Sequence, residues 1–185
     1  MLRRNPGPSL WTSAFVIALA LAAAPARADD MYLQLGDIQG ESTARGYERW
    51  IEVVSWSWGV ANPATVGAGT GLSAGRATLS DLTLMKFADS ATPRLLDGST
   101  RGTHFPKAAL AVRRSSDGFE YLRIRLEDVL VSSDQLSAGG DRPAESVGLS
   151  FVRFVLDYTP NPGKDRVSFG WDAAQNVAFN PPPQP

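Results

Sequence analysis

The chain has 185 residues, 43% of them hydrophobic and 20% charged, which fits one domain with a buried core. It has no cysteine and one histidine, His104, which excludes disulfide scaffolds, thiolate metal sites, cysteine nucleophiles and multi-histidine metal sites. A formal net charge of -1 argues against nucleic-acid binding.

The first 28 residues have the layout of a secretory signal peptide. Arg3 and Arg4 give a basic start, an apolar run covers Ala14–Ala24, and an A-x-A pattern ends at Ala28. The run is shorter than the roughly 20 residues that a membrane-spanning helix needs. We expect cleavage after Ala28 and a periplasmic or extracellular protein, whereas initiation at Met31 would leave it in the cytoplasm.

The rest of the chain reads as mainly β, because apolar and polar residues alternate along segments rich in Val, Ile, Trp and Phe. Ser115–Gly118 has the composition of a hairpin turn. In the segment that ends at Tyr158 the alternation slips by one residue near Phe151, which predicts a bulge or burial on both faces. The predicted strands are Met31–Ile38, Arg49–Val60, Ala77–Leu84, Ala108–Arg113, Phe119–Val131, Val147–Tyr158 and Val167–Val177.

One short helix is predicted over Thr92–Gly102. Thr92 is a favourable N-cap, Pro93 suits the first turn, and Gly102 can end the helix in a left-handed conformation. Glycine- and proline-rich segments complete the chain as a long flexible loop, a shorter loop and a disordered tail, at Asn62–Gly75, Ser137–Pro143 and Asn180–Pro185.

Few residues have the sequence spacing of a known catalytic or ligand-binding motif. His104 could act as a general base with Asp97 or a serine, but a lone histidine without such spacing is weak evidence. The glycines of Gly67–Gly71 precede a strand and no lysine follows them, so they do not form a phosphate loop. Glu127 and Asp128 should point to opposite faces of a strand and cannot act as a pair. We therefore expect no catalytic residue, no cofactor-binding residue, no metal ligand and no enzyme activity.

Three tryptophans, Trp50, Trp56 and Trp58, share one face of a strand by the period of two. Such a stripe favours a core or a subunit interface, because these rings bury a large area. A stacking platform for a glycan is the alternative.

Several short stretches form a further pattern, in a fixed order along the chain: Leu35–Ser42, Ile51–Gly59, Asp81–Thr83, Thr92–Leu96, Gly102–His104, Glu127–Ser133, Asp141–Val147 and Gly170–Trp171. From Met31 onward this order resembles the Hcp (haemolysin-coregulated protein) family of type VI secretion systems. Because the stretches extend over about 150 residues, the likeness is more specific than any single motif.

The resemblance implies a compact β-barrel of two sheets with one short α-helix, and it implies no cofactor. Family members assemble as hexameric rings that stack into tubes, and the implied further partners are secretion components and effectors carried in the ring lumen. The division expected is a signal peptide at residues 1–28, an Hcp-like domain at 29–179 and a Pro-rich tail at 180–185. No membrane anchor is expected after cleavage.

We therefore expect an exported, ring-forming structural protein. A closed ring also suits a β domain physically, because it pairs strand edges that would otherwise stay open. The signal peptide departs from the family, whose tube subunits polymerise in the cytoplasm and leave without a cleavable signal. The alternative is a monomeric secreted β domain that binds a glycan or a partner protein through a Trp-rich face.

Mass spectrometry of the protein recovered outside the cytoplasm should show Asp29 as the first residue, because the apolar run and the A-x-A pattern place cleavage after Ala28. An intact Met1, or a cytoplasmic protein that starts at Met31, would contradict the signal peptide.

Overall fold

The computed structural model describes residues 29–67 and 71–179, and these form a mainly β protein with one helix, as predicted. The predicted signal peptide, residues 68–70 of the glycine-rich run and the predicted tail lie outside the described residues. The elements are β1 (Asp30–Leu35), β2 (Ile51–Val53), β3 (Ser55–Ser57), β4 (Val60–Ala61), β5 (Ala64–Gly67), β6 (Gly71–Ala74), β7 (Thr78–Leu79), β8 (Leu82–Phe87), α1 (Thr92–Arg101), β9 (His104–Arg113), β10 (Glu120–Ser137), β11 (Ala144–Tyr158), β12 (Val167–Asp172) and β13 (Val177–Phe179).

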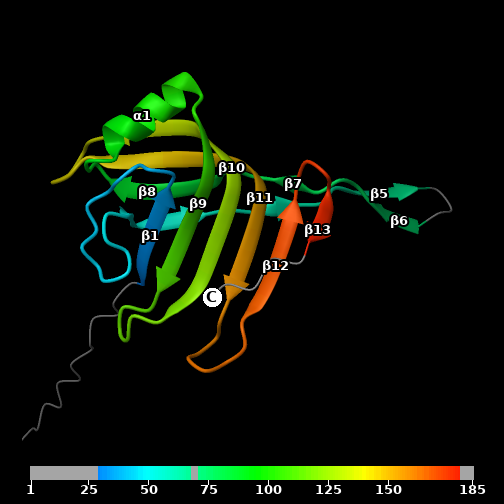
Figure 1. Ribbon diagram of the computed structural model, residues 1–185. Coiled ribbons are helices and arrows are strands. Elements are labelled where there is room, and N and C mark those ends of the chain that lie inside the picture. The colour runs from blue at the N-terminus through cyan, green and yellow to red at the C-terminus, as the bar shows by residue number, and fades with distance from the viewer. Residues whose placement is uncertain (1–28, 68–70, 180–185) are drawn as a thin grey trace, which may run out of the picture.

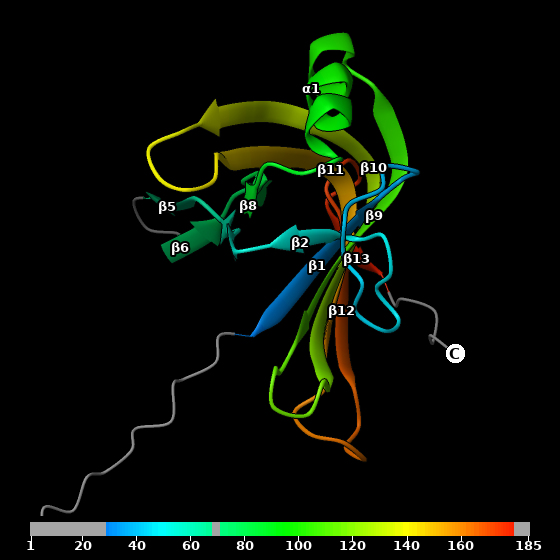
Figure 2. The same ribbon diagram turned by 90° about the vertical axis from the view of Figure 1, so that its left-hand side faces the viewer.

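The two longest strands, β10 and β11, belong to two layers at once (Figure 1, Figure 2). In the halves that are lower in Figure 1, the antiparallel strand order is β13-β12-β11-β10-β9-β1-β2. The upper half of β11 pairs with β8, and β8 also pairs with β3. β2 and β3 end the two branches and are joined at Val54. No closed barrel is detected among the described residues, so the barrel stays a prediction.

In three neighbouring strands, β9, β10 and β11, the alternation of buried and exposed residues shifts by one position at the same height in the sheet. In β10 the core residues are Ile124 and Leu126 before this level and Val129 and Val131 after it. Between them, Asp128 has a left-handed backbone with φ 53. β9 and β11 change in step, because their register with β10 continues across this level. The strands bend there, and the apolar face stays on the core in both layers (Figure 2).

The slip predicted near Phe151 is therefore confirmed, because Phe151 and Phe154 both pack against the same core. The register shift lies on the partner strand instead, between Val131 and Ser133 of β10. It brings Ser133 so close to Gly148 that a Cβ on Gly148 would lie 2.4 Å from the Ser133 hydroxyl oxygen. The bulge thus requires a glycine opposite it.

The helix ends as predicted and begins differently. Gly102 closes α1 with φ 64, and its N–H bonds the last turn. The N-cap is Ala91 rather than Thr92, because the helix already includes Thr92, and no side chain caps it. The Thr92 hydroxyl instead accepts a hydrogen bond of 3.1 Å from the backbone N–H of Asp89. Within residues 29–67 and 71–179, no helix has the length and hydropathy to cross a bilayer.

The expected long loop at Asn62–Gly75 is largely ordered as a hairpin. Ala64 pairs with Ala74, and Gly67 pairs with Gly71, which has φ 79. The prediction of a loop was wrong because each strand has only four residues and borders the turn with a glycine, which leaves too little alternation to indicate a strand. Backbone hydrogen bonds between β5 and β6 form the hairpin.

Replacing Gly98 with leucine should lower the free energy of unfolding by about 1 to 3 kcal/mol, because the added side chain overpacks a close contact. Gly98 lies on the buried face of α1, where a Cβ would meet the Phe105 ring at 3.1 Å. Urea unfolding measures the change. The exposed Thr100→Leu on the same helix should change this free energy by less than about 0.5 kcal/mol. Equal effects of the two variants would contradict this packing.

Candidate functional site

His104 has a carboxylate partner, but not the predicted one. Its Nδ1 lies 2.9 Å from Oδ1 of Asp128, and both side chains are exposed. Asp97 instead binds Arg101 at 2.6 Å, one helical turn away. Within the described residues no serine hydroxyl is hydrogen-bonded to the His104 ring, so a nucleophile–base–acid arrangement is not assembled there.

Glu127 and Asp128 do not lie on opposite faces, contrary to the prediction. Both line one shallow depression with Arg153, because the left-handed backbone of Asp128 breaks the alternation of the strand. Glu127 binds Arg153 at 3.1 Å, whereas Asp128 binds His104. Each carboxylate therefore has a basic partner, and the two form no acid–base pair.

The three tryptophans do not form one stripe. Trp50 packs on an outer cluster with Tyr32 and Tyr47, whereas Trp56 and Trp58 pack against the main core. The prediction failed because the strand bends at Val54, where the chain changes its pairing partner from β1 to β8. All three rings are half-buried, so the structure offers no continuous Trp-rich face for a glycan.

The outer cluster fixes the segment between β1 and β2 on the outer face of the long sheet. Tyr32 and Tyr47 stack at 4.8 Å, and the Tyr47 hydroxyl donates to Glu120. Burial and this hydrogen bond raise the pKa of Tyr47 to about 12, so the hydroxyl remains a donor at neutral pH.

Ion pairs cover the outer face of β10, β11 and β12. Arg125 binds Asp157 at 2.9 Å, and Arg153 binds Asp172 at 2.7 Å. A hydrogen bond from the backbone N–H of Gln175, together with Arg153, lowers the pKa of Asp172. An acid held ionised in this way is a poor proton donor.

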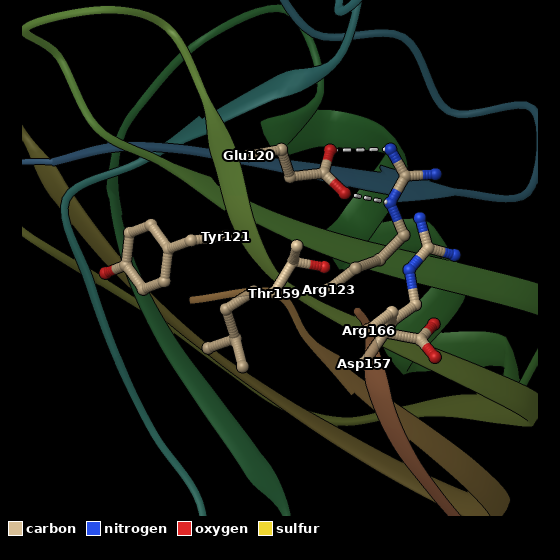
Figure 3. Close-up of a pocket in the computed structure, with 7 residues that line it drawn as sticks. Glu120, Tyr121, Arg123, Asp157, Thr159 and Arg166 are labelled. Carbon is tan, nitrogen blue, oxygen red and sulfur yellow. Dashed lines mark hydrogen bonds and ion pairs between the residues drawn. The ribbon is translucent and has the colours of Figure 1, made fainter. Parts of the chain in front are cut away.

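A pocket of about 140 Å³ lies at the end of this face (Figure 3). Glu120 holds Arg123 through two hydrogen bonds of 2.6 Å. Figure 3 shows the guanidinium of Arg166 beside that of Arg123, on the side of Asp157. The carboxylates lining the pocket are paired with arginines, so its chemistry favours weak anion contact over catalysis.

A larger depression of about 530 Å³ lies along the same outer face. Lys107 and Arg125 contribute charge, and Ala109, Val155 and Phe179 contribute apolar surface. Within residues 29–67 and 71–179, no group of three or more His, Asp or Glu side chains is placed to hold a metal.

The inner face of the long sheet is apolar beyond the end of the core. Leu156 packs against the core, and its cross-strand neighbour Phe169 is 50% exposed. The next pair on this face joins Tyr158, 44% exposed, to Val167, 67% exposed. We call Tyr158, Val167 and Phe169 the β12 patch. Tyr121 contacts one side of this patch, and Phe154 and Trp171 contact another, but about half or more of its surface is exposed in the described chain.

A second apolar surface lies on the other branch of the strand order. Met85 and Phe87 point outward from β8, and Val54 lies beside Phe87 in a shallow depression. We call these three residues the β8 patch. The Arg142 guanidinium lies 4.9 Å from the centre of the Phe87 ring. The two patches differ in sequence and lie on different branches of the strand order.

The β5–β6 hairpin projects from the body and forms a sheet of its own (Figure 1). Arg76 fixes its base by donating to the backbone oxygens of Ala173 and Ala174. A two-stranded hairpin is marginal by itself in water, so contact with another surface would stabilise it.

These features define a β protein whose exposed apolar surfaces suit contact with other chains. A comparison with known proteins gives the family: the profile described as "Type VI secretion system effector, Hcp" matches residues 32–158. Protein hcp1 of Pseudomonas aeruginosa is 38% identical over 157 residues, which are 80% of this chain and 97% of the relative. The chain belongs to the Hcp family of type VI secretion proteins, a structural rather than an enzyme family.

Solved structures agree with this family. One described as a type six secretion system protein has a TM-score of 0.77 at 30% identity, and the match covers 82% of this chain and all of that one. Hcp1 from Salmonella typhimurium has a TM-score of 0.72 at 29% identity, with 83% of this chain and all of that one covered.

The sequence did not reveal the two patches. Val167 and Phe169 do alternate with polar residues, which predicts a strand but not what covers its apolar side. If Leu82 and Leu84 face the core, the alternation of a strand places Met85 and Phe87 on the exposed face. These two apolar residues at exposed positions were the sequence signal for the β8 patch.

Deleting Thr65–Leu72 should leave the thermal unfolding of the isolated subunit cooperative and nearly unchanged in midpoint. The reason is that, among the described strands, β5 and β6 pair only with each other, and the deletion spares Arg76. Calorimetry measures the midpoint. A drop of more than about 5 °C, which corresponds to roughly 2 kcal/mol in a domain of this size, would show that the hairpin supports the fold.

Proposed function

We propose that this Hcp-family chain is a structural subunit that assembles into closed rings, most simply of six copies. The observation that supports this most directly is the β12 patch, a stretch of core-facing sheet left open to solvent. Covering it would bury apolar surface, which is the dominant favourable term in association. The family assignment supports a second copy of the chain as the partner.

A ring requires two different surfaces that fit each other, because each subunit meets one neighbour with each side. The β12 patch and the β8 patch meet this requirement, since they belong to different branches of the strand order. Placing one against the other would also cover strand edges that now lack a neighbour. A stable contact needs about 1,200 to 2,000 Å² of buried surface, so neighbouring strands would have to contribute as well.

The remaining parts of the proposal come from the sequence and the family likeness. Residues 1–28 act as a secretory signal peptide, the domain at 29–179 works outside the cytoplasm, and 180–185 form a tail. The domain works as a barrel without catalysis or a cofactor, with secretion components or effectors in the ring lumen as further partners. The projecting β5–β6 hairpin contacts the next ring in a stack.

Replacing Val167 with aspartate should convert the ring into folded monomers at micromolar concentration. The side chain is 67% exposed in the single subunit, so the fold tolerates the charge, whereas an unpaired charge buried at a contact is costly. Multi-angle light scattering on the mature chain measures the mass, and circular dichroism checks that the subunit stays folded.

The matched control is Val167→Thr, which keeps the shape without adding a charge and should still assemble. A wild-type mature chain that stays monomeric at high concentration would refute the ring and favour a monomeric binding domain. An aspartate variant with wild-type mass would instead remove the β12 patch from the interface.

A further inference from the structure

A group of charged side chains closes one end of the hydrophobic core. Lys86 follows Leu84 in the alternation of buried residues along β8, and it is only 2% exposed. Glu145 of β11 pairs directly with Lys86 and is 0% exposed. Asp134 of β10 lies on the same face, one diagonal step away, since Glu145 pairs with Leu136. Strands of both layers and the helix meet at this group.

The group is bonded to the first turn of the helix. The Lys86 ammonium lies 2.6 Å from Oε2 of Glu145 and 2.8 Å from Oδ1 of Asp89. It also donates to the Thr92 hydroxyl at 3.1 Å, and that hydroxyl donates to Glu145 at 2.5 Å. Thr92 is the first residue of α1, so these bonds connect the charged group to the start of the helix.

The charges are unequal, because one ammonium faces three carboxyl groups. Asp89 and one oxygen of Glu145 are satisfied by Lys86, by Thr92 and by the N–H of Ala91. The other oxygen of Glu145 and both oxygens of Asp134 are buried with no donor among the described residues. Two ionised carboxylates cannot bond each other, whereas a proton on one of them satisfies an oxygen of each.

We propose that Asp134 and Glu145 hold one proton between them, and that its loss loosens the attachment of the first turn of α1 to β8 and β11. Burial, the charge of Glu145 and a hydrogen bond with Glu145 raise the pKa of Asp134 to about 7, although Lys86 acts in the opposite direction. The charged groups that face the pair are Lys86 from β8 and Asp89 from the turn before α1, while α1 contributes the Thr92 hydroxyl.

The direction of the pH dependence follows from this pair. Between about pH 4 and pH 7, an aspartate whose pKa is raised by folding is protonated in the folded protein and ionised in the unfolded chain. The stabilisation from this proton is present at the acidic end of the window and is lost as the pH rises through about 7. The helix attachment is therefore firmer in a mildly acidic medium.

The test compares the wild-type mature chain with Asp134→Asn by urea unfolding at pH 5 and at pH 8. Asparagine is neutral at both pH values and has an N–H that can reach Glu145. The folding equilibrium constant of the wild type should fall at least about 10-fold more between the two pH values than that of the variant. Asp141→Asn is the matched control, because Asp141 is exposed in the connection between β10 and β11, and it should keep the wild-type dependence.

Equal pH dependence of the wild type and Asp134→Asn would overturn the proposal. Carboxyl NMR of the wild type tests it without any variant: a titration midpoint of Asp134 close to its ordinary value of about 4 would overturn it, and one near 7 supports it. Amide hydrogen exchange at pH 8 reports on the helix. The first turn of α1 should be less protected in the wild type than in Asp134→Asn, and equal protection would contradict the loosening.

Discussion

The fold depends on one constraint, that β10 and β11 keep a single apolar face on the core while they pass from one layer to the other. A strand that alternates strictly cannot do this through a sharp bend, because its side chains would turn away from the core. The chain meets the constraint with one change of phase at Asp128, made in step by β9, β10 and β11. Because all three strands change together, their hydrogen bonds continue across the bend.

The same geometry leaves apolar surface of the long sheet exposed. The layer formed by β8 and β3 covers only part of the long sheet, so residues 29–67 and 71–179 leave the lower end of the inner face exposed (Figure 2). Phe169 and Val167 lie there, on the face that Leu156 buries one strand away. Contact with a second copy of the chain would bury this surface, which is why the proposed interface includes it.

The other end of the core is closed by charge instead of by a partner. Lys86 and Glu145 occupy positions that continue the buried rows of β8 and β11, where an apolar pair would pack at lower desolvation cost. Their bonds to Thr92 and Asp89 tie the helix to both strands. The core thus ends in a cluster of ionisable side chains instead of an apolar one.

The sequence by itself determined the fold class, most strands, the hairpin turn at Ser115–Gly118, the end of the helix at Gly102 and the family. These features depend on residues that are neighbours in the chain or on the order of motifs along it, so alternation, turn composition and motif order indicate them. Only the tertiary structure decided which strands share a face. It separated Trp50 from Trp56 and Trp58, because the change of pairing partner at Val54 has no local signature. It also brought Asp134, Glu145 and Lys86 together from three strands, and it left Val167 uncovered, because both outcomes depend on which segments meet in space rather than on any residue's neighbours in the chain.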